Sequence, residues 1–510
     1  MRMNQRVFLK RGALFCLFIT TGLTYFGVYM KRIILTALAF LTVLSAGLSV
    51  SAEIPRGSLG YSEEDTKQVS QQKTEYNRAY WTLFSLIASS AAYAPDDGIE
   101  TVYLKGHGWE FSPNRITDGK TTVHFITAKG IMADSKPLYV IAFRGSADKK
   151  DWAADFVTGQ VVYGGHTLEE SEKISGFRLG GSKERDEIRA AAKKAGFARP
   201  PRVHKGFNSY ADLTLRMLLT SGSYEFLEQY RKEKEARLLL TGHSLGGAVA
   251  TIVGQRLIDF GFAPDRLQVI TFGAPAVGNT PFAQMYGDRL DLIRVTNSED
   301  PVPLTLQAVL RNYKQFGKEV RFRIPRTFNN MNHFLHLYLD AGLKNYYAVF
   351  DDTVKQGLIQ KEPDERHKAA DKPGVLLYVE GNELGGKAGN TEVKTTMALL
   401  ERFILNEYKA LFPNYVVVRS PQDPYEAMRT KGADYLMQVK FDAVTNQYNN
   451  NWFLTVEQTV TDKNGNVLLA DTASRRTSPL AGNILAAMEV IGVQKTELLR
   501  QMYWLKDEVQ

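Results

Sequence analysis

Residues 237–254 read RLLLTGHSLGGAVATIVG, and this stretch decides the fold. Its apolar run 238–240 predicts a buried strand, and the Ala- and Val-rich residues after Ser244 predict a helix. Gly242 and Gly246 match the pattern G-x-S-x-G, in which a serine occupies a sharp strand-to-helix turn where larger neighbouring side chains would clash. The helix points its N-terminus at the serine, where developing negative charge is favoured. Ser244 is therefore the candidate nucleophile.

Strand-like runs lie on both sides of this stretch. Before it the chain reads TTVHFITA at 121–128 and PLYVIAF at 137–143, and after it RLQVITFG at 266–273 and DLIRVT at 291–296. Because such runs alternate with helical segments, the pattern predicts βαβ units and a largely parallel sheet. We therefore expect an α/β fold, with residues 53–352 as the main domain.

The C-terminal part of the chain predicts a second, smaller α/β domain. Residues 353–373 are charged and poorly patterned, which is typical of a linker. In residues 374–510 strand-like and helical runs alternate, and Asn464-Gly465 supplies a hairpin turn. The Gly-rich stretch 380–386 lacks the G-K-[ST] ending of a phosphate loop, so we expect a surface loop there. We interpret 374–510 as an accessory module that binds an envelope component or the main domain itself, and we expect a chain that ends near residue 360 to stay soluble.

The start of the chain predicts an export signal, residues 1–52. The basic pair Lys31-Arg32 precedes the apolar run 33–52, which ends in small residues. Met30 is then the true start, and residues 1–29 are an over-extended gene model. Two short membrane spans are the alternative. We expect the folded part to be exported to the periplasm, the cell envelope or the medium.

Charge and cysteine content exclude several classes of protein. The chain carries 63 Lys and Arg against 55 Asp and Glu, a net charge of +8. Much of this excess falls in residues 1–52, so the remainder is close to neutral and shows no basic face for nucleic acid. Cys16 is the single cysteine, which excludes a disulfide framework and a Cys-based zinc site.

A serine hydroxyl becomes nucleophilic only when a base takes its proton and a carboxylate orients that base. Asp300 follows a strand-like run, at a sheet end where an acid is needed, and Glu299 is the neighbouring alternative. Downstream of Asp300 the chain contains His333, His336 and His367. Because His367 falls in the expected linker, the base is His333 or His336.

His333 and His336 are three residues apart and compete for this role. His333 precedes an apolar run, so we place it in a loop or first helical turn that can reach the strand ends. His336 lies among apolar residues, where a packed and locally hydrogen-bonded histidine is more usual. We expect His333 to be the base, with His336 as the alternative.

Five segments occur in order along the chain. They are Ala142-Phe143-Arg144-Gly145-Ser146 with Asp151-Trp152 after it, VHKGF at 203–207, GHSLGG at 242–247, TFGAPAVGN at 271–279 and RVTNSEDPVP at 294–303. Together they resemble the class 3 lipases, the fungal-type triacylglycerol lipase family of α/β-hydrolases. The resemblance extends over about residues 60–350. His333, Leu335, Tyr338 and Leu339 also fit a pattern that bacterial and plant members often show, so the resemblance favours His333 as well.

The resemblance implies a site and an activity. Ser244 would be the nucleophile, Asp300 the orienting acid and a downstream histidine the base. Ser146 would supply an oxyanion-hole donor, joined by the backbone N–H of Leu245. We expect a serine hydrolase that cleaves carboxylic esters of lipids at a lipid interface, without metal or organic cofactor. The alternatives are a phospholipase or acyltransferase on the same scaffold, or a lipid-binding protein that has lost catalysis.

Residues 163–202 form a long insert that is rich in glycine and charge. A lid of the family would fall near this point. We expect a mobile cover over the site, with a plain surface insertion as the alternative.

Overall fold

The computed structural model describes residues 63–93, 104, 108–119, 121–131, 136–146, 159–176, 183–220, 223–304, 307, 312–324, 333–385, 389, 391–445, 452–476 and 483–502. The expected export signal, residues 1–52, lies outside the described residues. Among the helices that are described, none is both long enough and apolar enough to cross a lipid bilayer.

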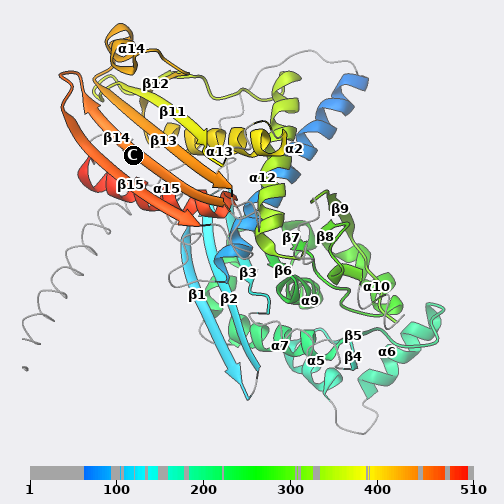
Figure 1. Ribbon diagram of the computed structural model, residues 1–510. Helices are drawn as coiled ribbons and strands as arrows, with labels where there is room; N and C mark the ends of the chain where they lie inside the picture. The colour runs from blue at the N-terminus through cyan, green and yellow to red at the C-terminus, as the bar shows by residue number, and fades with distance from the viewer. Residues whose placement is uncertain are drawn as a thin grey trace, which may run out of the picture. The chain divides into compact units, whose positions relative to one another are not determined.

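A seven-stranded sheet forms the centre of the first part (Figure 1). Its order is β1 (Glu110–Asp118), β2 (Thr121–Ile131), β3 (Pro137–Phe143), β6 (Arg237–His243), β7 (Leu267–Phe272), β8 (Asp291–Asn297) and β9 (Lys318–Phe322). The first three strands pair antiparallel, whereas β3, β6, β7, β8 and β9 run parallel. The expectation of an α/β fold with a mostly parallel sheet is confirmed.

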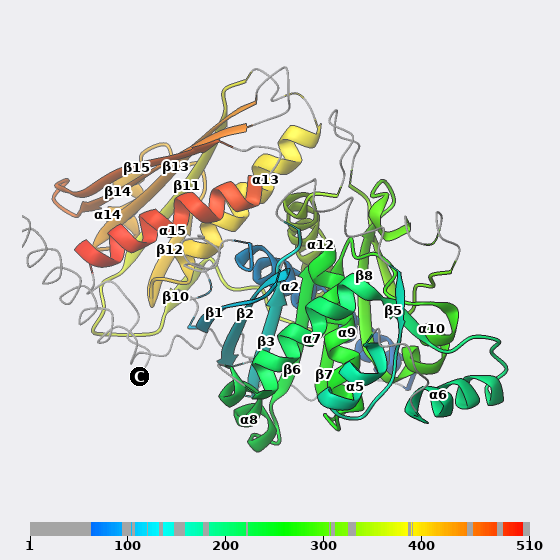
Figure 2. The same cartoon turned by 90° about the horizontal axis from the view of Figure 1, so that it is seen from below.

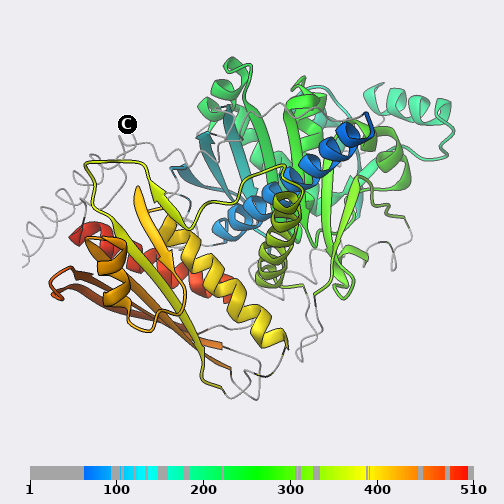
Figure 3. The same ribbon diagram turned by 90° about the horizontal axis from the view of Figure 1, so that it is seen from above.

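Helices cover both faces of this sheet. Figure 2 shows α7 (Lys205–Thr220) and α9 (Leu245–Asp259) over one face, and Figure 3 shows α2 (Glu63–Ala91) and α12 (Leu335–Lys355) over the other. Alternate residues of β3 explain both layers, because Tyr139 and Ile141 pack with the first pair of helices while Leu138 and Val140 pack with the second. The remaining elements here are α8 (Tyr224–Lys232), α10 (Thr280–Tyr286) and two short 3₁₀ turns, Pro264–Arg266 and Gly287–Arg289.

The insert contains α5 (Leu168–Ser175) and α6 (Lys183–Lys194), and the paired strands β4 (Gln160–Val162) and β5 (Arg202–His204) lie at its two ends. Its first residue, Tyr163, is fully buried, with its ring 3.9 Å from the Arg256 guanidinium and its hydroxyl donating to Asp259 Oδ2 at 2.8 Å. Arg256 and Asp259 lie near the C-terminal end of α9, about 18 Å along the helix from Ser244. The base of the insert therefore packs at the far end of α9, and the expectation of a mobile cover over Ser244 is wrong for this part of it.

A six-stranded sheet forms the C-terminal part. Its order is β10 (Glu365–His367), β12 (Asn414–Val418), β11 (Val375–Glu383), β13 (Tyr435–Thr445), β14 (Trp452–Asp462) and β15 (Val467–Arg476). The helices α13 (Thr391–Lys409) and α15 (Asn483–Gln501) lie side by side across one face (Figure 2), and α14 (Pro424–Lys431) packs on the other. Met437, Val439 and Phe441 of β13 point at α13 and α15, which explains the alternating pattern of this strand.

The charged stretch 353–373, expected to be a linker, contains the last turn of α12 and β10. β10 pairs antiparallel with β12, and the Arg366 guanidinium lies 4.8 Å from the ring of Tyr415. The Lys409 ammonium pairs with Asp364 at 2.8 Å. Charged residues of the expected linker therefore stabilise the contact of the edge strand β10 with the C-terminal sheet.

Candidate active site

The turn between β6 and α9 holds Ser244 in a strained backbone conformation. Its φ is +57° and its ψ is −125°, a region that residues with a side chain rarely adopt. A Cβ atom on Gly242 would collide with the backbone of Gly246, and one on Gly246 would collide with the carbonyl of Phe143. The two glycines are therefore needed for the turn to close against β3, and the predicted elbow is present.

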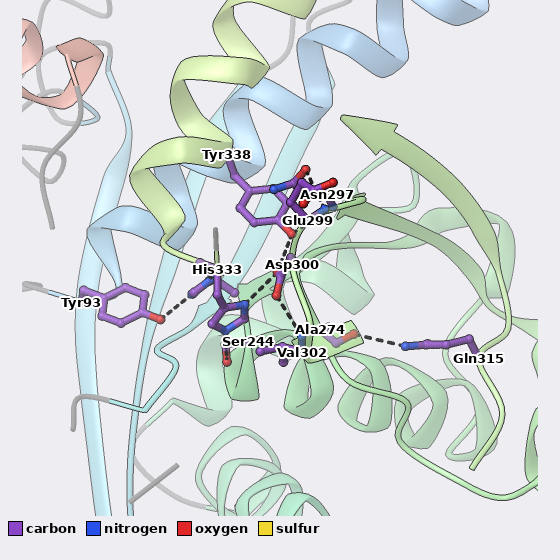
Figure 4. Close-up of polar contacts among 11 residues, drawn as sticks. Tyr93, Ser244, Ala274, Asn297, Glu299, Asp300, Val302, Gln315, His333 and Tyr338 are labelled. Carbon is purple, nitrogen blue, oxygen red and sulfur yellow. Dashed lines mark hydrogen bonds and ion pairs between the residues drawn. The ribbon is translucent and has the colours of Figure 1, made fainter. Parts of the chain in front are cut away.

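Three residues from distant segments meet at this turn (Figure 4). Ser244 comes from the β6–α9 turn, Asp300 follows β8, and His333 stands just before α12. The Nε2 atom of His333 lies 2.8 Å from Ser244 Oγ, and its Nδ1 atom lies 2.8 Å from Asp300 Oδ2. All three side chains are buried, with 4%, 3% and 7% of their residues' surface exposed for Ser244, Asp300 and His333. The structure thus brings the predicted nucleophile, acid and base into one hydrogen-bonded chain.

The carboxylate of Asp300 is held by further donors. Tyr338 Oη donates to Asp300 Oδ2 at 2.7 Å, and the backbone N–H of Val302 donates to Oδ1 at 2.9 Å. The Tyr338 hydroxyl in turn accepts the backbone N–H of Asn297 at 3.1 Å. Burial and the neighbouring carboxylate raise the pKa of Tyr338 well above its usual value, so this hydroxyl keeps its proton. The alternative acid, Glu299, is exposed to solvent.

A glycine lies directly beneath the acid–base pair. Gly273 follows β7 with φ +56°, and a Cβ atom there would come within 2.7 Å of Asp300 Oδ2 and 3.1 Å of the His333 ring. The position therefore requires glycine both for its backbone and for its space. On the same side of the site, Gln315 Nε2 donates to the carbonyls of Ala274 and Pro303 at 3.2 and 3.0 Å, which joins the two loops.

His243 connects the site to Tyr93, two residues beyond the end of α2. Its Nε2 atom lies 2.6 Å from the His333 carbonyl oxygen, so this nitrogen carries the proton and donates it. Its Nδ1 atom then accepts from the Tyr93 hydroxyl at 2.8 Å. Burial and the nearby His333 hold the pKa of His243 well below its usual value, so the ring is neutral. The backbone of His333 is thereby fixed by a neutral imidazole.

The alternative base, His336, lies on α12 and is 8% exposed. Its ring stacks on Phe334 with centroids 5.6 Å apart. Burial lowers the pKa of His336 to about 4. Of the two candidates, it is His333 whose ring contacts both Ser244 and Asp300.

The expected oxyanion donors lie beside the same turn. Ser146 Oγ is buried and has no hydrogen-bond partner among the described residues. Its neighbour Gly145 is packed against Tyr93 and against the His243 carbonyl, next to Ser244. Leu245 is the first residue of α9, and the first N–H groups of a helix have no acceptor within it. Both groups can therefore donate to an added oxygen atom.

Sequence reasoning missed several residues of this arrangement. Tyr93 carried no signal, because a tyrosine just after the end of a helix is ordinary. Tyr338 was noticed as part of a spacing pattern but not as a donor to the acid. Gly273 and Gln315 act through the packing of loops, which a pattern in one segment does not reveal.

Comparison with known proteins identifies relatives for part of the chain. Residues 140–309 match the family model described as Lipase (class 3). The lipase of Rhizomucor miehei is 27% identical over 187 residues, 36% of this chain and 41% of the relative. Phospholipase A1-II 4 of Oryza sativa subsp. japonica is 27% identical over 207 residues, 37% of this chain and 45% of the relative. Secreted mono- and diacylglycerol lipase 1 of Fusarium solani is 39% identical over 84 residues, 16% of this chain and 24% of the relative.

The chain spans less than half the length of each of these three relatives. Among solved structures, the triacylglyceride lipase of Rhizomucor miehei aligns with a TM-score of 0.35 and 20% identity, over 52% of this chain and 83% of that one. The resemblance to the class 3 lipases, which five sequence segments predicted, is confirmed by the family match over residues 140–309.

Proposed function

We propose that this protein is a serine hydrolase that cleaves carboxylic esters of lipids through an acyl-enzyme on Ser244. One observation carries the proposal: the imidazole of His333 is hydrogen-bonded at 2.8 Å to both Ser244 Oγ and Asp300 Oδ2. A neutral histidine between a hydroxyl and a carboxylate can take the hydroxyl proton while the carboxylate stabilises the imidazolium that forms.

The reaction follows from these positions. His333 Nε2 takes the proton as Ser244 Oγ attacks the ester carbonyl carbon, and the carbonyl oxygen becomes an oxyanion. Ser146 Oγ–H and the Leu245 N–H donate to that oxygen. His333 then gives its proton to the departing alcohol, which leaves the acyl group on Ser244. Water, activated by the same imidazole, releases the acid and restores the serine.

Lipids as the substrate class are supported by the names of the relatives. Two of them are named lipases and one is named a phospholipase A1, so both neutral lipids and phospholipids are candidate esters. An acyltransferase would use the same acyl-enzyme and replace water by another alcohol. We also propose that the protein is exported, because residues 30–52 have the composition of a signal peptide and one relative is named as secreted.

A fluorophosphonate probe tests the proposal directly, because it phosphonylates an activated serine. We expect the wild-type chain to be labelled on Ser244 and Ser244→Ala to remain unlabelled. Ser209→Ala is the matched control, since Ser209 is an exposed serine on α7 that bonds only within its own helix turn in the described structure. Absence of labelling in the folded wild-type chain, or equal labelling of Ser244→Ala, would overturn the proposal. A panel of triacylglycerol, phospholipid and short-chain esters then identifies the substrate.

A further inference from the structure

The helix α12 carries part of the candidate site and part of the contact with the C-terminal sheet. His333 stands just before its first residue, and Tyr338, the donor to the acid, lies in its first turns. Further along, Asp340, Tyr347 and Asp351 follow at intervals of seven and four residues, which places them on one face of the helix. Both groups of residues therefore depend on where this one helix lies.

The carboxylate of Asp340 caps the N-terminus of α15. Its Oδ1 atom accepts the backbone N–H of Ile484 at 3.0 Å, and its Oδ2 atom accepts that of Asn483 at 3.3 Å. Because α15 begins at Asn483, these N–H groups have no acceptor in the helix's own ladder, and the positive end of the helix favours a carboxylate. Burial raises the pKa of Asp340 to about 6, against the opposing effect of the two donors. The group is thus ionised at pH 8, and its residue is half-buried.

A second contact fixes the other end of the same face. The guanidinium of Arg402, on α13, forms two hydrogen bonds of 2.9 Å with the Asp351 carboxylate and lies 3.9 Å from the ring of Tyr347. Such a paired, planar contact restricts both position and angle. Between the two polar contacts, Leu343 belongs to the same hydrophobic core as Ile484 and other residues of α15.

We propose that the C-terminal sheet, through α13 and α15, holds α12 in the position that lets His333 reach Ser244, and that Asp340 is the principal positioning residue. This inference rests on the function proposed above. An acyl transfer tolerates little displacement, since a shift of about 1 Å in a reacting group can lower the rate about 100-fold. On the side of the hydrolase part, α12 packs against α2, where Gly342 meets Leu86, and Tyr338 bonds to Asp300. The contacts at Asp340 and Asp351 hold the helix from the opposite part and restrict its rotation and sliding.

The proposal changes the role expected for residues 374–510. A removable binding module would leave the hydrolase part unaffected, whereas a positioning element alters catalysis when its contact is loosened. Both parts belong to one compact unit, residues 50–507, and share one hydrophobic core. The contact at Asp340 can therefore be examined in the full-length chain without deleting either part.

The experiment compares Asp340→Ala, Asp340→Asn and the control Asp352→Ala. Asp352 lies on the same helix, but its side chain is 62% exposed and, in the part of the chain that the structure describes, pairs with Lys355 one turn on. Its loss therefore tests the helix and not the contact. On a short soluble ester we expect Asp340→Ala to lower kcat about 10- to 100-fold with KM changed less than about twofold. Asp340→Asn keeps one acceptor oxygen, so its kcat should lie between those of the wild type and Asp340→Ala. Asp352→Ala should keep kcat within about twofold.

The pH profile separates positioning from general stability. If His333 moves relative to Asp300, the pH at which kcat/KM falls by half shifts in Asp340→Ala, while a folded protein with an unmoved site keeps the wild-type profile. If circular dichroism shows that Asp340→Ala does not fold, Asp340→Asn and Arg402→Gln replace it in the test. We then expect the same shift of the pH profile and a smaller loss of kcat. Wild-type kcat and profile in the folded variants would overturn the inference, and so would an equal loss in Asp352→Ala.

The two proposals fail in different ways. A wild-type chain that does not react with the fluorophosphonate probe contradicts the proposed function, and the positioning role falls with it. A wild-type chain that reacts, together with Asp340 and Arg402 variants that react at the same rate, contradicts the positioning role alone.

Discussion

The two ends of α9 are both surrounded by buried polar side chains, but the chemistry of the two clusters differs. Ser244 precedes the helix in a strained conformation, one hydrogen bond from His333. At the other end Arg256 is fully buried, and its guanidinium donates to the Gly164 carbonyl at 2.6 Å and lies over Tyr163. Asp259 completes this second cluster by accepting from Tyr163.

The difference shows what separates a reactive cluster from a structural one. Because a histidine stands between Ser244 and Asp300, the Ser244 proton can move to His333 while the Asp300 carboxylate stabilises the imidazolium that forms. An arginine in the middle cannot release its proton, so the cluster around Arg256 can only hold chain segments together. Burial and polarity are common to both ends, and neither alone indicates a site.

Replacing the nucleophile gives the largest expected effect. Ser244→Ala should lower kcat by about 10⁴- to 10⁶-fold, because alanine has no hydroxyl beside His333 to form the acyl-enzyme. The free energy of unfolding should change by less than about 1.5 kcal/mol, since alanine loses one hydrogen bond to His333 and keeps the strained turn. Ester hydrolysis and urea unfolding measure the two quantities. A variant with more than about 1% of wild-type kcat would show that another residue is the nucleophile.

The opposite result is expected at the other end of α9. Arg256→Met should lower the free energy of unfolding by about 3 kcal/mol, because it leaves the buried Gly164 carbonyl without its donor and removes the cation from the ring of Tyr163. In the folded protein kcat should change less than about twofold, since Arg256 lies about 18 Å along the helix from Ser244.

The matched control for this variant is Arg189→Met. Arg189 is exposed on α6 and pairs with Asp186 one turn away, so its loss should cost less than about 0.5 kcal/mol. Loss of kcat without loss of stability in Arg256→Met would contradict the division between the two ends of the helix.

His336, the second histidine near the site, offers a test in which the free energy of unfolding depends on pH. Because burial lowers the pKa of His336 to about 4, the unfolded chain binds a proton there between pH 6.5 and 4 that the folded chain does not. Stability from this residue is therefore present above pH 6.5 and is lost as pH falls toward 4. Relative to His336→Gln, the wild type should lose about 3 kcal/mol over this range.

Urea unfolding at pH 7, 5.5 and 4 measures this difference. His367→Gln is the control, because the His367 side chain is 64% exposed on β10. Its unfolding free energy should follow that of the wild type at all three pH values. If the unfolding free energy of His336→Gln also follows that of the wild type at all three pH values, His336 is not desolvated in the folded protein. Probe labelling of His336→Gln at pH 8 should remain at the wild-type level.

The sequence predicted those parts of the site that lie in short segments with their own backbone requirements. The turn at Ser244 is visible because Gly242 and Gly246 are needed locally, and Asp300 because it ends a strand of a parallel sheet. His333 was distinguished from His336 by the onset of an apolar run. Each of these signals comes from residues within a few positions of one another.

Contacts between distant segments gave no such signal. The composition of residues 353–373 indicated a linker, yet Arg366 and Lys409 meet over Tyr415 only after β10 and β12 have paired. The glycines and charges of 163–202 suggested mobility near the site, and it is the burial of Tyr163 under Arg256 that places the base of the insert elsewhere. Long-range packing decides both cases, and composition does not report it.

The smallest expected effect concerns the hydroxyl of Tyr338, which tests whether the acid needs support from α12. Tyr338→Phe removes the 2.7 Å hydrogen bond to Asp300 Oδ2 and the 3.1 Å bond from Asn297 N–H, but leaves the bond from Val302 N–H and the packing of the ring. Loss of one of several donors to a carboxylate corresponds to about 1–2 kcal/mol, so kcat should fall about tenfold with KM unchanged. Tyr346→Phe is the control on the same helix, because its hydroxyl bonds to Tyr76 and not to the triad. If both variants keep wild-type kcat, the carboxylate is held well enough by Val302 and His333, and the influence of α12 on the site passes through His333 alone.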